Sequence, residues 1–283
     1  MHGLRVFEHA SDTGSWRISS LAPNGALAIY AHAIHAYEER DTVFRRRREL
    51  PDGSAVLIFN LGKELRVEHP VGAVRAFGEG AGLCSGASAT YVVTETDGAQ
   101  TGAQIKFSLL GARLFFGRPL AELGDALVDP LEPMGRSGAE LRDRLADART
   151  QGQRVELLVR AVERQLGQPV RLAPALVSAF SRLSRADLRI SVLAREVGMS
   201  RERFSKAFRR EFGLAPKTFA RVRRFARAVS RRERDPSLDG AGLAAACGYV
   251  DQAHMIRDFQ EFAGSPPAAL WRRGLPDAGG FVD

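Results

Sequence analysis

Residues 192–213 read VLAREVGMSRERFSKAFRREFG, and residues 242–264 read GLAAACGYVDQAHMIRDFQEFAG. Both stretches contain an alanine among small residues, a glycine four residues later, and then a residue suited to cap a helix. These residues are Ala194, Gly198 and Ser200 in the first stretch and Ala244, Gly248 and Asp251 in the second. Alanine lets two helices approach closely, glycine adopts the positive φ of a tight turn, and a cap oxygen accepts from the next helix's free N–H groups. The repeated pattern predicts two helix-turn-helix units.

The second helix of each unit is expected to bury large apolar side chains at helical spacing. These anchors are Phe204, Phe208 and Phe212 in the first unit and Met255, Phe259 and Phe262 in the second. Between the units, a basic amphipathic helix of about 25 Å is expected over residues 216–232, long enough to hold them roughly one DNA turn apart. Its exposed residues are expected to be Arg221, Arg223, Arg224, Arg227, Arg231 and Arg232.

Charge is distributed unevenly along the 283 residues, which amount to about two domains. Residues 1–172 carry 21 basic and 21 acidic residues, whereas residues 173–273 carry 20 basic against 10 acidic ones. A net charge of +10 on this part of the chain indicates a polyanionic partner. A membrane surface or an acidic protein also fits the charge alone, and non-specific nucleic-acid packaging is a further alternative. The helix-turn-helix pattern favours sequence-specific DNA binding.

Residues 173–273 resemble the DNA-binding domain of the AraC/XylS transcriptional regulators. The matching positions in the first half are Leu193-Ala194, Gly198-Met199-Ser200, Phe204, residues 208–213, Pro216 and Arg224. Those in the second half are Leu243-Ala244, Gly248-Tyr249, Asp251-Gln252, Phe259, Gly264 and Pro267. The resemblance implies seven helices, a unit that reads two major-groove segments, and control of transcription. The chain departs from the family pattern at Gln260-Glu261 and at Leu270-Trp271, which predicts fewer phosphate contacts from the second half.

The resemblance assigns base reading to the second helix of each unit, by motif position. These residues are Glu202, Ser205 and Lys206 in the first unit and Gln252, Ala253, Ile256 and Arg257 in the second. Arg and Lys suit guanine, Gln suits adenine, and Ile or Ala can contact a thymine methyl. Glu202 either accepts from a cytosine amino group or pairs with Lys206 four residues later, and we favour the pair slightly. Contacts to the DNA backbone are expected from Ser200, Arg201, Arg209, Arg210, Arg224 and Asp251.

The first 130 residues predict short strands separated by turns. The candidates are residues 27–30, 55–59, 64–67, 90–94 and 104–109, with the run Arg45–Arg48 as a solvated strand edge. A helix pair broken at Gly152 follows, with apolar stripes along residues 141–148 and 155–166. We therefore predict an α+β protein with four parts. These are a β-rich domain at 1–166, a linker at 167–172, an all-α DNA-binding domain of about seven helices at 173–273, and a tail at 274–283.

Residues 50–62 and 115–124 resemble a cupin-like N-terminal domain found in one branch of the same regulators, where its usual role is effector sensing or dimerisation. Cupin oxygenases hold iron through histidines and a carboxylate, so a metalloenzyme fused to a DNA-binding module is the alternative function. His32 and His35, followed by Glu38 and Glu39, are the nearest match. Three residues apart on a strand, two histidine rings point to opposite faces, and no third ligand is evident. We therefore predict no metal, no cofactor and no enzymatic activity.

The remaining features concern location and partners. Cys84 and Cys247 are too few for a disulfide framework, and neither a signal peptide nor a membrane span is evident. Cys84 is either a redox-sensing thiol or an unreactive bystander, which we favour, and Cys247 is expected in the core. We expect a cytoplasmic protein with double-stranded DNA and RNA polymerase as partners, and consider a small-molecule effector and a homodimer. The operator and the sign of regulation are not encoded in any recognisable motif.

Overall fold

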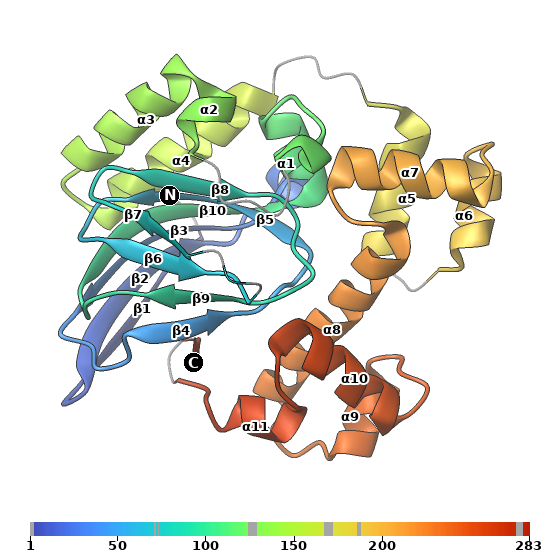
Figure 1. Ribbon diagram of the computed structural model, residues 1–283. Helices are drawn as coiled ribbons and strands as arrows, with labels where there is room; N and C mark the ends of the chain where they lie inside the picture. Colours follow the sequence, from blue (N-terminus) through green and yellow to red (C-terminus); the bar gives the residue numbers. More distant parts are fainter. Residues whose placement is uncertain are drawn as a thin grey trace.

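The computed structural model describes residues 3–70, 72, 74–123, 129–166, 172–185, 188–275 and 280–283. Two antiparallel β-sheets dominate the N-terminal part, and helices form the C-terminal part (Figure 1). The fold class is α+β, as predicted. The predicted linker at 167–172 lies almost entirely outside the described residues.

The N-terminal sheets stack face to face. The six-stranded sheet runs in the order β1 (Leu4–Ser11), β2 (Gly14–Leu21), β3 (Ala31–Arg40), β10 (Gln100–Ser108), β5 (Ser54–Asn60) and β8 (Gly82–Ser85). The five-stranded sheet runs β11 (Phe281–Val282), β4 (Arg46–Glu49), β9 (Val92–Glu95), β6 (Leu65–Glu68) and β7 (Val74–Phe77). Since β11 is the last strand of the chain, the C-terminal tail completes a sheet of the N-terminal part.

The larger sheet has two chemically different faces, because side chains alternate along each strand. Toward α4 (Gln151–Leu166), which contacts β2, β3 and β10, it presents fully buried apolar residues. Examples are Ile34, Leu57 and Ile105, which pack in one core with Val155 and Leu158 of α4. Toward the second sheet the intervening positions present polar residues such as His35, Gln104 and Lys106, which line a cavity. The continuous apolar run at 55–59 reflects covering on both faces.

Several predictions about the N-terminal part need correction. Residues 27–30 were expected as a strand, but they form the end of a 3-10 helix, η1 (Gly25–Ile29), and its C-cap. The helix pair is present as α3 (Arg136–Asp147) and α4, but the break lies at residues 148–150, so Gly152 falls inside α4. The arginine run does not form a solvated edge: β4 pairs with both β9 and β11, and Arg47 and Arg48 form largely buried ion pairs with Glu39 and Asp283.

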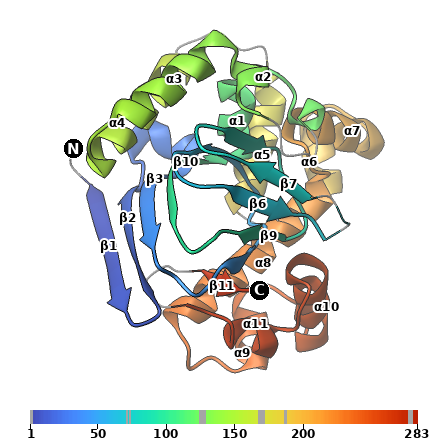
Figure 2. The same ribbon diagram turned by 60° about the vertical axis from the view of Figure 1, so that its left-hand side comes forward.

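Short helices link the sheets to the rest of the molecule. They are α1 (Leu109–Phe115), η2 (Leu120–Glu122) and α2 (Leu131–Met134). The described C-terminal part then contains seven helices, α5 (Pro174–Arg185), α6 (Ile190–Glu196), α7 (Arg201–Phe212), α8 (Pro216–Arg234), α9 (Gly240–Ala246), α10 (Gln252–Ala263) and α11 (Pro267–Trp271). Helices α3 and α4 lie on one side of the sheets and α9–α11 on the opposite side (Figure 2).

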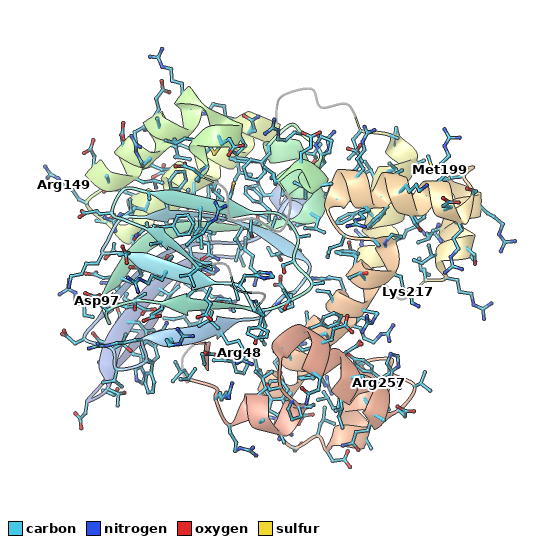
Figure 3. All side chains as sticks on the ribbon, in the orientation of Figure 1. Arg48, Asp97, Arg149, Met199, Lys217 and Arg257 are labelled. Carbon is cyan, nitrogen blue, oxygen red and sulfur yellow. The ribbon has the colours of Figure 1, made fainter. Side chains whose placement is uncertain are left out.

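The boundary between the two large apolar cores lies inside α8, not at the predicted linker. One buried cluster joins the helix-covered face of the large sheet to α5, α6, α7 and the beginning of α8. A separate cluster contains the rest of α8 with α9, α10 and α11, together with Phe281 of the tail. The first helix-turn-helix unit therefore shares a core with the N-terminal part, whereas the second has a core of its own. In Figure 3, the labelled Met199 marks the turn of the first unit, between α6 and α7, and the labelled Arg257 marks α10 of the second unit.

Candidate nucleic-acid interface and barrel cavity

The first helix-turn-helix unit consists of α6 and α7. Gly198 adopts φ +68° in the turn between them, and the hydroxyl of Ser200 accepts from the backbone N–H of Arg203 at 3.2 Å. Ala194 is 1% exposed where the two helices meet. The turn, cap and close approach that the sequence predicts are thus all present. They fix the angle at which α7 leaves the turn.

The second unit, α9 and α10, repeats this construction. Gly248 has φ +78°, and the Asp251 carboxylate accepts from the N–H of His254 at 2.6 Å. The predicted anchors of both units are fully buried or nearly so: Phe204, Phe208, Phe212, Met255, Phe259 and Phe262. Cys247 packs in the second core, as expected. Two matched units therefore stand at the two ends of α8, whose 19 residues span about 28 Å.

On α7, the predicted DNA-reading side chains lie on the side opposite the core. Arg201, Glu202, Lys206, Arg209 and Arg210 are exposed, and Ser205 is half-buried. The favoured pair within the helix is present, with Lys206 Nζ 2.7 Å from Glu202 Oε1. The opposite face of α7 packs against α1 and η2 of the N-terminal part, where Arg113 donates to Glu211 at 2.6 Å in an almost fully buried ion pair. The N-terminal part thus covers the back of α7 and leaves its polar face accessible.

On α10, Asp251, Gln252, Ala253 and Arg257 are exposed, and Ile256 is half-buried. The amide of Gln252 lies over Gly240, the first residue of α9: a Cβ on that glycine would sit 2.4 Å from Gln252 Nε2. The sequence pattern gave no sign of this contact. The glycine therefore decides where one predicted base-reading side chain lies.

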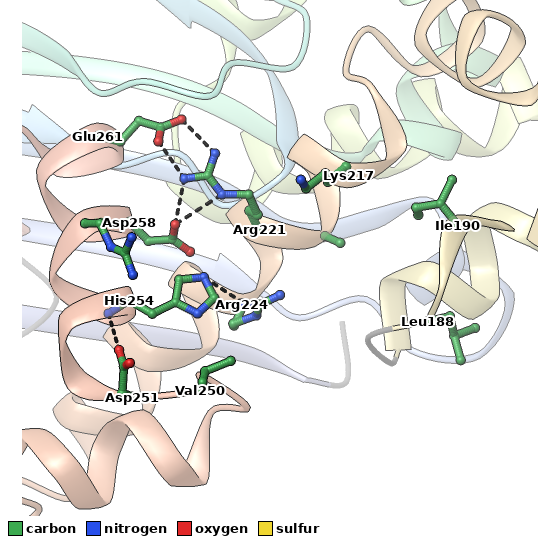
Figure 4. A pocket seen from close by; sticks show the side chains of 12 residues that line it. Leu188, Ile190, Lys217, Arg221, Arg224, Val250, Asp251, His254, Asp258 and Glu261 are labelled. Atoms are coloured by element: carbon green, nitrogen blue, oxygen red, sulfur yellow. Dashed lines mark hydrogen bonds and ion pairs between the residues drawn. The ribbon is translucent and has the colours of Figure 1, made fainter. Parts of the chain in front are cut away.

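A cleft of about 640 Å³ separates the two units, with α8 as its floor and α10 as one wall (Figure 4). Arg224 and Arg257, predicted to contact phosphate and bases respectively, both line it, together with Lys217. The Arg224 guanidinium lies 5.2 Å from the centre of the Tyr249 ring, and its Nη1 is 3.4 Å from His254 Nε2. These three basic side chains share the cleft with the carboxylate of Asp251 and with the ion cluster described next.

One wall of the cleft contains an ion cluster that sequence reasoning missed. Arg221 was expected to be exposed, but it binds Asp258 at 2.7 Å and Glu261 at 2.5 Å (Figure 4). Hydrogen bonds to Glu261 and Asp258, opposed by burial, raise the pKa of the guanidinium. Asp258 is 1% exposed, so Arg221 ties α8 to α10 in the interior. Glu261, where the sequence departs from the family pattern, is thus paired with Arg221. The other arginines of α8 also correct the prediction: among the six, only Arg231 is classed as exposed, and the rest are half-buried.

A second candidate site lies between the two N-terminal sheets, which together are called here the barrel, and it is called the barrel cavity. A cavity of about 480 Å³ separates the sheets, and five of its lining side chains have a buried polar atom without a hydrogen-bond partner among the described residues. These atoms are His35 Nδ1, Arg47 Nη2, Ser54 Oγ, His69 Nε2 and Gln100 Oε1. Buried polar groups are normally satisfied by protein, ordered water or a ligand, so these five atoms mark the polar part of the cavity wall.

Two buried titratable side chains of the cavity, His35 and Tyr37, have pKa values shifted toward their neutral forms. Burial, assisted by the positive charge of Lys106, lowers the pKa of His35 to about 4. Burial raises the pKa of Tyr37, with Glu39 and Glu49 adding to the effect. Near neutral pH both therefore offer uncharged donors and acceptors. Cys84 lies outside this cavity and is buried, and burial raises its pKa to about 12, so it lacks the thiolate character of a redox sensor.

No metal centre is formed around the histidines that suggested one. Both lie on β3, where His35 lines the cavity and His32 is exposed. Within the described ranges, no three His, Cys, Asp or Glu side chains gather in a way that could hold a metal ion. None of the helices in the described ranges is long and apolar enough to cross a membrane.

Comparison with known proteins identifies the C-terminal part. Residues 193–273 match a family model described as a helix-turn-helix domain, and no curated protein matches the chain. Among solved structures, an apo variant of ToxT from Vibrio cholerae is 9% identical over 92% of this chain and 97% of its own, with a TM-score of 0.47. ToxT with a bound unsaturated fatty acid is 8% identical over 93% and 96%, with a TM-score of 0.44.

The iron(II) form of HppE is a weaker match, 10% identical over 37% of this chain and 56% of its own, with a TM-score of 0.29. Scores this low describe a loose likeness in shape. The range matched by the family model contains α7, α9 and α10 and most of α6, and so both helix-turn-helix units. Residues 193–273 of this chain therefore form a helix-turn-helix domain of the AraC type.

Proposed function

We propose that this chain is a sequence-specific transcriptional regulator whose α7 and α10 read adjacent segments of the DNA major groove. One observation carries the proposal: two capped helix-turn-helix units stand at the ends of α8, and each exposes most of the side chains suited to base edges. Lys206 on α7 and Arg257 on α10 are the strongest candidates, because Lys and Arg recognise guanine. Exposed arginines such as Arg201 and Arg209 would fix the register on phosphates.

The division into a unit at 1–166 and a DNA-binding unit at 173–273 is part of this proposal. The first helix-turn-helix unit shares its core with the N-terminal part, which supports close communication between the two units. Contact with RNA polymerase and assembly into a homodimer remain predictions from the family resemblance.

The test compares base-reading with phosphate-contacting residues on a selected operator and on random DNA of the same length. Lys206→Ala or Arg257→Ala should weaken operator binding by about 1–3 kcal/mol and relax the preference at one or two base pairs. Arg209→Ala, the matched control on α7, should weaken both duplexes alike. If Lys206→Ala weakens both duplexes equally, Lys206 does not read bases. If the wild type binds all duplexes equally at about 0.15 M salt, the regulator proposal is wrong.

We further propose that the barrel cavity holds a small uncharged effector with several hydrogen-bonding groups. The unpartnered atoms of His35, Ser54, His69 and Gln100 support this, since such a molecule would satisfy them without adding buried charge.

The effector test uses thermal unfolding of the full chain with a panel of sugars, polyols, nucleosides and small amides. A binding member should raise the Tm of the wild type, and Gln100→Leu, of nearly equal volume, should abolish that rise. Gln260→Leu, on the exposed surface of α10, is the control and should keep it. A rise that persists in Gln100→Leu would place the ligand elsewhere, and no rise with any member would contradict an effector of this class.

A further inference from the structure

The turn at residues 51–54, called here the coupling turn, lies between the barrel and α8. Gly53 adopts φ +77°, and a Cβ at this position would sit 2.8 Å from Cδ of Arg223 and 3.0 Å from the ring of Phe219. The backbone carbonyl of Asp52 accepts from Arg223 Nη1 at 3.0 Å. The turn is therefore packed directly on α8, and only glycine fits at its point of closest approach.

The other side of the coupling turn faces the barrel. The Asp52 carboxylate is 2.7 Å from Lys106 Nζ on β10, and it also accepts from the backbone N–H of Ser54 at 3.0 Å. The hydroxyl of Ser54 is one of the unpartnered atoms of the barrel cavity. Lys106 and Asp52 also line a second cavity of about 460 Å³, between the barrel and α8. One short turn thus connects both spaces.

The charges around the turn depend on one another. Burial alone would raise the pKa of Asp52, but the charge and hydrogen bond of Lys106 outweigh it and hold this pKa below its usual value. Burial lowers the pKa of Arg223, and the negative charge of Asp52 opposes that effect. A change at Lys106 therefore alters the environment of Arg223 through the carboxylate that lies between them.

Helix α8 is the element that sets the separation of the two helix-turn-helix units. Phe219 belongs to the core shared with the first unit, and Phe225 to the core of the second. Arg223 lies between these two residues. A displacement of α8 at Arg223 would therefore act where one core ends and the next begins.

We propose that Lys106 is a positioning residue for DNA binding: through Asp52 and the coupling turn it sets the placement of α8, and so the half-site spacing that α7 and α10 accept. The proposal rests on the proposed DNA-binding function and adds a route by which the barrel cavity influences it. A ligand that binds Lys106 or Ser54 in the barrel cavity would therefore change the position of the coupling turn. Lys106 lies on β10, whereas the predicted base-reading side chains lie on α7 and α10. An effect of Lys106 on DNA binding can therefore be distinguished from the loss of a base contact.

The experiment measures the Kd of the full chain for duplexes that carry the two selected half-sites at the preferred spacing and with one or two base pairs added or removed. Lys106→Met should change the ratio of Kd values between preferred and shifted spacings at least fivefold. Lys63→Met is the control, because Lys63 forms an exposed lysine–aspartate pair with Asp97 at 2.6 Å, away from the coupling turn. Its ratio should stay within twofold of the wild type.

The ratio separates positioning from simple destabilisation, because a lower folded fraction weakens binding at every spacing alike. If Lys106→Met does not fold, Asp52→Asn preserves the size of the side chain and should shift the ratio in its place. Unchanged ratios in both variants would overturn the proposal while leaving the DNA-binding function intact. A wild type that binds its operator without any spacing preference would also overturn it. Equal binding to all duplexes would instead contradict the proposed function, and the positioning role with it.

Discussion

Gln252 of α10, a proposed base-reading residue, lies against Gly240 of α9. Its amide occupies the space that a side chain at Gly240 would take. Gly240→Ala should therefore displace Gln252 and reduce the preference for the base that it reads, by up to tenfold. The added methyl should not destabilise the fold, because alanine favours a helix over glycine by about 0.5–1 kcal/mol.

The measurement is operator affinity against a duplex substituted at that one base pair, combined with chemical denaturation. Gly242→Ala, in the same helix, is the control for added helix propensity, although its Cβ would lie close to the capping Asp239. An unchanged base preference in Gly240→Ala would show that Gln252 either moves freely or reads no base.

His35 predicts a pH dependence of stability. Its pKa in the folded protein is about 4, below the ordinary value of 6.5, so the unfolded chain binds the proton more tightly. This contribution to stability is therefore complete above pH 6.5 and is lost as the pH falls from 6.5 toward 4, by at most about 1.4 kcal/mol per pH unit. His35→Gln should flatten the stability profile in that window, as measured by urea denaturation at a series of pH values. Parallel profiles for the wild type and His35→Gln would contradict the assignment.

At the scale of elements, the N-terminal turn of α10 depends on one cap. Asp251→Ala removes the acceptor that holds the N–H of His254 and should cost about 1 kcal/mol, whereas Asp251→Asn should cost much less. Because Gln252 and Ala253 lie in that turn, operator affinity should fall more than affinity for random DNA. Urea denaturation and the two Kd values check this. Equal losses on both duplexes would mean that the turn contributes no sequence reading.

The elements that the sequence predicted best are those whose signals are local. Ser200, Gly198 and the phenylalanine spacing of α7 lie within 15 residues of one another, and each has one structural meaning. Strand β1 was missed because it is exposed along most of its length, and β3 because its cavity-facing positions include His35 and Glu39, which hide the usual alternation. Residues 27–30 looked like a strand because a short apolar run does not distinguish a strand from a helical turn.

Contacts between distant segments could not be predicted from local patterns. The pairing of β11 with β4, the Arg221 cluster with Asp258 and Glu261, and the contact of Arg223 with Asp52 each join residues far apart in the chain. From the sequence alone, an arginine on the polar face of an amphipathic helix is assigned to solvent, because its acidic partner lies elsewhere in the chain. The exposure predicted for α8 failed for that reason.

At the scale of the whole molecule, the Arg113–Glu211 pair joins α1 to the back of α7. Both side chains are less than a tenth exposed, so removing one partner leaves a buried charge without this counterion. Glu211→Gln should destabilise the protein by about 3–5 kcal/mol, measured by chemical denaturation. Glu202→Gln, which breaks the exposed pair on the same helix, should cost less than about 1 kcal/mol. Similar losses in the two variants would indicate that the buried pair does not hold the two parts together.

If α7 and α10 read adjacent major-groove segments, one chain should bind a site with two half-sites. We would select such sites from a pool of random duplexes with the full chain, at about 0.15 M salt. We expect one enriched motif with two half-sites whose centres lie about 10 base pairs apart, and we expect Lys206→Ala and Arg257→Ala each to lose the preference in one half-site. Enrichment of a single half-site that depends on only one of these residues, or no enrichment at all, would contradict this expectation.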